Sequence, residues 1–353
     1  MYQDPFLRQV TVDFDVANLP LKRRLSFGRF EIVPMAESGV LYPATLGPGI
    51  HWEISARGRY RASFDEPRAA SAVADEYIAH DDALHLLLTF ARGSYVPLLR
   101  ARLVAQTLDN QVWTRSFSDA GVVAPRSGWP IYDNEDELVK FLTEAHPKVL
   151  DPSIGYEQNV RSALFLMSMA FDHEWVENQF FVAWQALEVL IQQPDTRKKI
   201  VPSGSQFDKK IRPLIERVMD EVLPRLLGQE PDAADLVDQA KSKIGELNRP
   251  PIIETARKFF VGLGEDVDRQ TLQGYIERRN RIGHTGLGWQ RMPLETVSLE
   301  LHKQYRDEMN LFSWQLFNLI RSAILRMLVD GPLLTQLLQG AKMSLTEVRA
   351  DEN

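Results

Sequence analysis

The chain has 353 residues, with 41 Lys and Arg against 48 Asp and Glu, and it contains no cysteine. The absence of cysteine excludes disulfides, thiolate catalysis and cysteine-ligated zinc or iron–sulfur sites. Apolar residues make up 44% and charged residues 25% of the chain, as in ordinary globular proteins and unlike disordered or collagen-like chains. A net charge of −7 argues against indiscriminate coating of nucleic acid and leaves room for a local basic site.

No targeting or membrane-spanning segment is visible. The first residues, MYQDPFLRQ, lack the basic and apolar regions of a secretory signal. The most apolar long stretch, residues 311–329, contains Gln315, Asn318, Arg321 and Arg326, and is too polar for a membrane span. We therefore expect a cytoplasmic protein that does not contact a membrane.

The first 130 residues are typical of a β-rich domain. Residues 10–16 alternate apolar and polar side chains with period two, which predicts a half-buried strand. Similar patterns predict strands at 27–33, 51–64, 98–104 and 111–117. Residues 69–90 read as one or two helices, with Asp81 or Asp82 as an N-cap for the second. The Pro-, Gly- and Ser-rich stretch 123–130 predicts a linker.

Beyond the linker the pattern changes to helices. The expected helices are 135–145, 156–171, 174–192, 207–227, 233–247, 252–262, 268–284 and 294–328. Pro213 and Pro224 should kink or divide the fourth, and the last is apolar over most of its surface, as in the centre of a bundle. The sequence thus predicts an α+β fold: a β-rich N-terminal domain at 1–130, an all-helical bundle at 131–345 and a flexible tail at 346–353.

Two basic clusters stand out in the N-terminal domain. Arg57, Arg59 and Arg61 alternate along a predicted strand, so three guanidinium groups should share one face beside Tyr60. A second cluster precedes them and contains Lys22, Arg23, Arg24 and Arg29. Both could bind nucleic acid or a phosphorylated trigger ligand, and a solvent-exposed sheet face explains them equally well.

Several familiar catalytic motifs are absent, among them GxxxxGK[ST], GxGxxG after a strand, GxSxG and HExxH. Of the seven histidines only His80 and His85 lie close in sequence, and on a helix they would point roughly 140° apart. A metal interpretation of His80, Asp81 and His85, or of residues 172–174, is weaker than capping and ordinary helix polarity. We predict no metal site and no cofactor.

The segment Glu277–Gly286 concentrates three arginines, an amide and an imidazole within a few helical turns. Asn280 and His284 are four residues apart and should share a face, whereas the Cβ vectors of Arg279 and His284 diverge. The helix should loosen at Gly283 and end near Gly286. There the helix dipole raises the pKa of a histidine while neighbouring arginines lower it, a balance that suits general acid–base catalysis. A solvated helix end with a favourable charge is the structural alternative.

The helical context extends this observation to a family resemblance. An all-helical domain with Arg279, Asn280 and His284 near the end of its penultimate long helix resembles the HEPN superfamily, whose hallmark is Arg, four to six residues, then His, usually with Asn after the Arg. The segment Phe181–Glu188, with Trp184 and a Leu-Glu pair, is similar to the first core helix of the ApeA-like HEPN branch. The resemblance covers roughly residues 150–330.

The resemblance implies a metal-independent endoribonuclease. In that reaction the 2′-hydroxyl of the RNA attacks the adjacent phosphate, leaving a 2′,3′-cyclic phosphate and a 5′-hydroxyl, so DNA should be inert. His284 would act as general base or acid, Arg279 would stabilise the phosphorane, and Asn280 would orient His284 or the phosphate. ApeA-like relatives are associated with prokaryotic anti-phage defence, which would make the chain a defence or toxin-like effector.

The superfamily's usual arrangement also implies a homodimer with a composite active site, because one histidine cannot easily act on both sides of the phosphate. Arg278 and Arg281 could hold the RNA backbone, in a stretch with eight basic and five acidic residues between 249 and 291, although Arg281 could equally pair with Glu277. Glu188 could pair with Arg279 inside the fold or cap the core edge of its helix, with Trp184 as support. The alternative function is a non-catalytic HEPN module that binds RNA or nucleotide, or acts as a dimeric scaffold.

Overall fold

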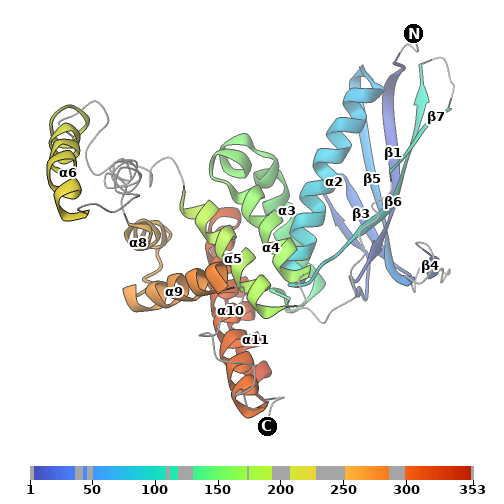
Figure 1. The fold of residues 1–353 in the computed structure, drawn as a ribbon. Coiled ribbons are helices and arrows are strands. Elements are labelled where there is room, and N and C mark those ends of the chain that lie inside the picture. The colour runs from blue at the N-terminus through green and yellow to red at the C-terminus, as the bar shows by residue number, and fades with distance from the viewer. Residues whose placement is uncertain are drawn as a thin grey trace. The chain divides into compact units, whose positions relative to one another are not determined.

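A computed structural model describes residues 4–35, 43–45, 51–108, 112–117, 130–172, 175–192, 207–227, 251–285 and 299–350. Its first half is an antiparallel sheet of seven strands in the order β2-β3-β5-β1-β6-β7, with β4 paired to β5 (Figure 1). The strands are β1 (Phe6–Ala17), β2 (Leu25–Phe27), β3 (Phe30–Pro34), β4 (Pro43–Thr45), β5 (His51–Ala69), β6 (Leu98–Thr107) and β7 (Val112–Phe117). Helices follow, so the predicted α+β order is confirmed. The predicted linker at 123–130 lies almost wholly outside the described residues.

Alternation along the central strands decides which side chains enter the core. In β1, Val10, Val12, Phe14 and Val16 are buried, and the intervening positions face the other side of the sheet. The ring of Phe14 lies against the backbone of Gly58 on β5, where a Cβ would fall 2.0 Å from it. Glycine at this position therefore allows the two central strands to pair with Phe14 in the core.

One helix, α2 (Ala70–Arg92), covers the buried face of the sheet (Figure 1). It is continuous, so of the two expected alternatives the single helix is confirmed, and a second helix with an N-cap at Asp81 or Asp82 is wrong. Asp81 instead accepts a hydrogen bond from the Tyr77 hydroxyl one turn earlier, at 2.7 Å. Apolar residues on both sides of this position are buried, and their packing against the sheet outweighs the local capping signal.

The sheet, α2 and most later helices belong to one compact unit, residues 1–190 and 277–353. Its helices are α3 (Glu135–Leu150), α4 (Val160–Asp172), α5 (Val176–Ile191), α10 (Leu299–Leu328) and α11 (Gly331–Ala350), with a π-helical turn η1 (Pro152–Glu157) before α4. Asn134 caps α3, because its side chain accepts hydrogen bonds from the backbone N–H groups of Asp136 and Glu137. The domain boundary expected near residue 130 stays a prediction.

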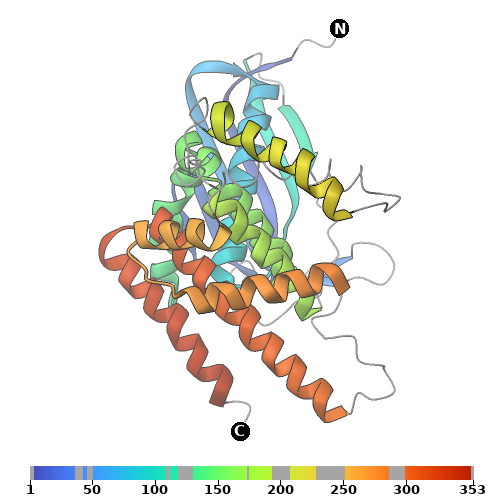
Figure 2. The same cartoon turned by 60° about the vertical axis from the view of Figure 1, so that its left-hand side comes forward.

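Two successive helices, α10 and α11, end the described chain (Figure 2). They are joined at Gly331, whose φ of +63° favours glycine; a helix after Leu328 was not predicted. Deep in α10, Arg321 is fully buried and donates from Nη2 to the carbonyl of Phe90 near the end of α2, at 3.3 Å. Burial lowers the pKa of Arg321 to about 9. Side chains after residue 340 are not described, so the flexible tail at 346–353 stays a prediction.

The second compact unit, residues 191–276, contains η2 (Phe207–Ile211), α6 (Arg212–Leu227), α8 (Ile252–Gly262) and the beginning of α9 (Arg269–Thr285). The π-helical turn ends at Ile211 and α6 begins at Arg212. Pro213 therefore lies in the first turn of α6, where proline is tolerated. Pro224 lies within α6 and does not end it. The helix expected at 233–247 lies outside the described residues.

No helix in the described part of the chain is both long and apolar enough to cross a membrane.

Candidate active site

The predicted motif lies at the end of α9, and the burial of its neighbours shows which face its arginine occupies. Leu272, Tyr275 and Ile282 are buried, and positions 272, 275, 279 and 282 fall on one stripe of a helix. Arg279 therefore lies on the apolar side of α9. On the same side, a Cβ at Gly283 would approach the Phe181 ring of α5 to 3.5 Å. The motif end of α9 packs on α5.

Glu188 of α5 receives the Arg279 side chain. Nη2 of Arg279 donates to Oε1 of Glu188 at 3.2 Å, and the indole Nε1 of Trp184 donates to the same oxygen at 2.7 Å. The predicted pairing of Glu188 with Arg279 is thus confirmed. Trp184 is almost fully buried and lies one turn before Glu188, so the fixed indole orients the carboxylate, which in turn orients the guanidinium.

Part of the Arg279 guanidinium remains available for a ligand. Its Nη1 donates to Oδ1 of Asn280 at 2.9 Å, and each terminal nitrogen carries a second N–H. The side chain is 39% exposed, whereas its Nε is buried without a hydrogen-bond partner among the described residues. Buried at one edge and exposed at the other, Arg279 can offer two N–H groups to an anion.

Asn280 is exposed, and it accepts from Arg279 through its amide oxygen. That bond assigns the amide orientation and leaves the two N–H groups of Nδ2 without a partner among the described residues. Asn280 can therefore add donors next to those of Arg279.

His284 lies in the last described turn of α9 (Arg269–Thr285), and the helix end expected near Gly286 lies outside the described residues. Its side chain is outside the described residues, as are residues 286–298. The shared face of Asn280 and His284, and the proton-transfer role of His284, stay predictions.

The two flanking arginines differ. Arg278 forms an ion pair with Glu308 of α10, and its guanidinium carbon lies 3.2 Å from the centroid of the Phe312 ring. Its side chain is only 17% exposed, so Arg278 fastens α9 to α10. Arg281 is exposed; its predicted contact with RNA, like its alternative pairing with Glu277, stays a prediction.

The residues weighed as metal ligands have separate surroundings. His80 stacks on His146 with ring centroids 5.1 Å apart, and Nδ1 of His85 lies 2.8 Å from the carbonyl oxygen of Val96. Surface capping and ordinary helix polarity, the explanations preferred for the group of His80, Asp81 and His85, do not describe His80, because its ring packs inward against Phe30 and His146. In the described part of the chain no three potential ligands come together. His173 and Glu174 lie outside it.

The basic residues of the N-terminal domain separate into different surroundings. Arg57, Arg59 and Arg61 share the open face of the sheet as predicted, joined by Arg24. Tyr60 does not lie beside them, because it is 1% exposed on the opposite face, where Arg29 donates to its hydroxyl at 3.0 Å. Two further residues of the cluster face α3: Arg23 pairs with Asp136, and the backbone N–H of Lys22 donates to Glu135.

Comparison with protein-family models, with curated proteins and with solved structures finds no match. The function is therefore inferred from the residues of α5 and α9.

Proposed function

We propose that this chain is a metal-independent endoribonuclease of the HEPN type. The observation that supports it is the position of Arg279, held by Glu188 and Trp184 of α5 with two N–H groups left over, beside Asn280 and just before His284. An arginine on the apolar stripe of a helix loses hydration, so a role that needs its charge at a fixed place explains its position.

The residues have distinct roles in the proposed reaction. The 2′-hydroxyl of RNA loses its proton and attacks the adjacent phosphorus; the bond to the 5′ oxygen breaks, and that oxygen gains a proton. The donors of Arg279 stabilise the phosphorane, and Asn280 orients the phosphate or His284. The His284 side chain transfers a proton. The nucleophile belongs to the substrate, and neither a metal nor a cofactor is required.

The proposal includes a homodimer with a composite site. One imidazole serves one side of the phosphate, and the copy from the second protomer serves the other. The biological role, a cytoplasmic effector of anti-phage defence or a toxin-like protein, follows from the HEPN resemblance alone.

RNA cleavage in EDTA tests the proposal. The expected products carry a 2′,3′-cyclic phosphate, and both Arg279→Ala and His284→Ala should slow cleavage by at least about 100-fold. Arg306→Ala is the matched control, because Arg306 is an exposed arginine of α10. If the enzyme is active only after a trigger, the same variants are compared for growth inhibition in cells instead of for cleavage of RNA by the purified protein. Cleavage or toxicity that persists in both variants refutes the proposal.

Mixing the wild-type chain with the His284→Ala variant tests the composite site. In the heterodimer only one imidazole remains for the two sides of the phosphate, so cleavage should fall far below half the rate of the wild-type homodimer. A confirmed heterodimer that keeps half of the wild-type rate contradicts a site shared between protomers.

One observation favours the non-catalytic alternative. Both terminal nitrogens of Arg279 already donate to protein oxygens, as in an arginine that only joins two helices. In that case a short RNA raises the melting temperature without yielding product, and Arg279→Ala lowers the melting temperature in the absence of RNA.

A further inference from the structure

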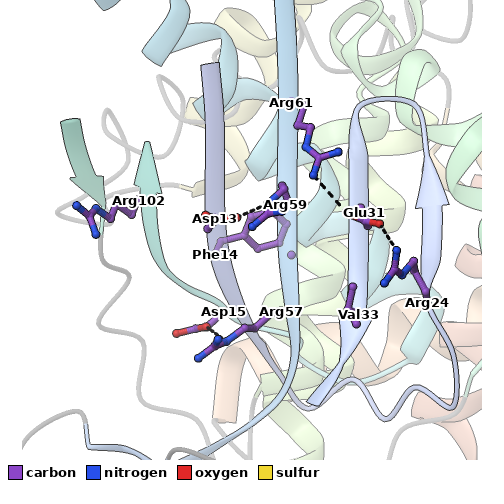
Figure 3. A pocket seen from close by; sticks show the side chains of 11 residues that line it. Asp13, Phe14, Asp15, Arg24, Glu31, Val33, Arg57, Arg59, Arg61 and Arg102 are labelled. Carbon is purple, nitrogen blue, oxygen red and sulfur yellow. Dashed lines mark hydrogen bonds and ion pairs between the residues drawn. The ribbon is translucent and has the colours of Figure 1, made fainter. Parts of the chain in front are cut away.

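The face of the sheet opposite α2 carries an open hollow of about 690 Å³. Its charged lining consists of Arg24, Arg57, Arg59, Arg61, Arg102, Asp13, Asp15 and Glu31. Figure 3 shows these side chains on neighbouring strands, with the three β5 arginines in the centre. Five positive charges face three negative ones, an excess of cations in a chain whose net charge is −7.

Strand register brings these charges together. Arg59 lies opposite Glu31 of β3 on one side and opposite Asp13 of β1 on the other. Asp13 in turn lies opposite Arg102 of β6. Asp13 thus lies between an arginine of β5 and an arginine of β6, and Glu31 lies beside Arg59 and also pairs with Arg24, which precedes β2, at 2.9 Å.

The ion pairs leave the outer edges of two central guanidinium groups exposed. Arg59 uses Nε to reach Asp13 at 2.6 Å, and Arg57 uses Nε to reach Asp15 at 3.7 Å. The described contacts of both arginines involve Nε alone, and about 45% of each side chain is exposed. The carboxylates therefore hold both arginines through Nε, and no described hydrogen bond or ion pair occupies the two terminal nitrogens, the part that can bind a phosphate.

Arg102 strengthens this argument. It is exposed on β6 and forms no hydrogen bond or ion pair with the residues that the structure describes; in Figure 3 no dashed line reaches it. Surface ion pairs elsewhere on this face contribute at most about 1 kcal/mol each. Neither stability nor pairing accounts for a fifth arginine here.

The shape and spacing of the hollow indicate the class of ligand. Alternate residues of a strand are roughly 7 Å apart, so Arg57, Arg59 and Arg61 form a row about 13 Å long instead of a single phosphate cradle. A nucleotide pocket would be enclosed and partly apolar, whereas this hollow is open. Among the described residues that line it, the only aromatic one is Phe14, which is 2% exposed and offers no surface for base stacking.

We propose that the arginine face of the sheet binds the phosphate backbone of nucleic acid without reading its sequence. The contacts are electrostatic and go to successive phosphates, as in backbone binding generally. This surface lies on the opposite side of the sheet from α2 and includes no residue of α5 or α9, so binding here does not depend on cleavage at Arg279.

Fluorescence anisotropy with a labelled single-stranded DNA of about 20 nucleotides tests the proposal. DNA has no 2′-hydroxyl, so the proposed nuclease cannot cut it, and failure of one proposal is distinguishable from failure of the other. The logarithm of the binding constant should fall linearly with that of the salt concentration. Arg57→Gln/Arg59→Gln should weaken binding roughly 20-fold at 0.1 M salt and flatten this slope by about 1.4, since two phosphate contacts are lost.

Two further variants control the result. Arg212→Gln/Arg217→Gln removes the same charge from exposed i, i+4 pairs on α6 and should leave affinity within about twofold. Arg102→Gln breaks no described interaction, so it tests the surface even where the double variant fails to fold. Since one phosphate contact is lost, DNA affinity should fall roughly fivefold. DNA probes of a different sequence and duplex probes should give the same order of affinities among the variants, because the proposed contacts go to the phosphate backbone.

Three results would overturn the proposal: no DNA binding by the wild-type chain at 0.05 M salt, equal losses in the α6 control, or stronger binding of a nucleoside triphosphate than of the oligonucleotide. The last result would assign the hollow to a compact polyphosphate instead.

Discussion

Arg279 and Arg59 each lie beside a carboxylate, yet their surroundings differ. Glu188, the partner of Arg279, is 21% exposed and is held by a buried tryptophan, whereas Asp13, the partner of Arg59, is 55% exposed on an open sheet. The first pair is shielded on one side from water, and the second is screened by solvent and salt. The comparison shows that ion pairs of the same residue types differ in how far they are shielded from water, and the two proposed roles, in chemistry for Arg279 and in anion binding for Arg59, depend on this difference.

The largest effect should come from the residue that supports the deeper pair. Trp184→Ala removes a buried indole and the donor to Glu188, and should lower the free energy of unfolding by about 3–5 kcal/mol. Urea unfolding measures it. Trp175, which is 70% exposed, is the matched control, and Trp175→Ala should stay within about 0.5 kcal/mol. Equal effects of the two variants would contradict the proposed support.

A pH titration extends the comparison to a still deeper polar group. Burial lowers the pKa of His146 to about 4, and burial also lowers the pKa of His80, on which it stacks. Unfolded histidine titrates near 6.5, approximately. The fold therefore favours the neutral imidazole. Its contribution to the free energy of unfolding is complete above about pH 6.5 and is lost as the pH falls toward 4, in total about 3 kcal/mol for His146.

Urea unfolding at several pH values between about 7 and 4 checks this dependence. His146→Phe should flatten the curve, since the phenyl ring does not titrate. A wild-type chain whose stability does not change over this range would show that the buried histidines are hydrated.

A smaller loss should follow from removing the carboxylate of the deeper pair. Glu188→Ala leaves both the Trp184 indole and one nitrogen of Arg279 without an acceptor, and should cost about 1–3 kcal/mol. If the proposed function holds, the same change should reduce RNA cleavage because Arg279 loses its orientation. Glu188→Gln keeps an acceptor oxygen and should recover most of the stability. A Gln variant as unstable as the Ala variant would show that the charge, not the hydrogen bond, is decisive.

The smallest effect belongs to the open sheet. A double-mutant cycle with Asp13→Ala and Arg59→Ala should give a coupling free energy below about 1 kcal/mol, and 1 M salt should reduce it further. The same cycle for Glu188 and Arg279 should give a larger, less salt-sensitive value. Equal coupling at the two sites would remove the distinction between them.

Local sequence patterns predicted much of this architecture. Period-two alternation located the main strands and placed Arg57, Arg59 and Arg61 on one face, because the side-chain direction of a strand depends only on residue parity. The helical period located α3 to α6, α8, α9 and α10. The pairing of Glu188 with Arg279 was one of two alternatives for Glu188, the other being a cap at the core edge of its helix, and the structure shows the pairing.

Other features of the structure had only weak signals in the sequence, or none. The polar residues Asp81 and Asp82 suggested a helix start inside α2, although packing keeps that helix continuous. A helix after Leu328 was missed, although Asp330-Gly331-Pro332 is a signal for one. Gly331 adopts the positive φ of the break between α10 and α11, and Pro332 suits a first helical turn. The apolar stripe of Leu272, Tyr275 and Ile282 likewise places Arg279 on the inner side of α9.

The sequence by itself determined the order of sheet and helices, the faces of the strands and the proximity of Arg279 and Asn280, since each depends on neighbours within a few residues. Only the tertiary structure decided which groups meet from afar: Asp13 and Glu31 on either side of Arg59, Phe312 under Arg278, and His146 on His80. Those partners depend on strand register and helix packing, which are set by burial summed over the whole core and not by any local pattern.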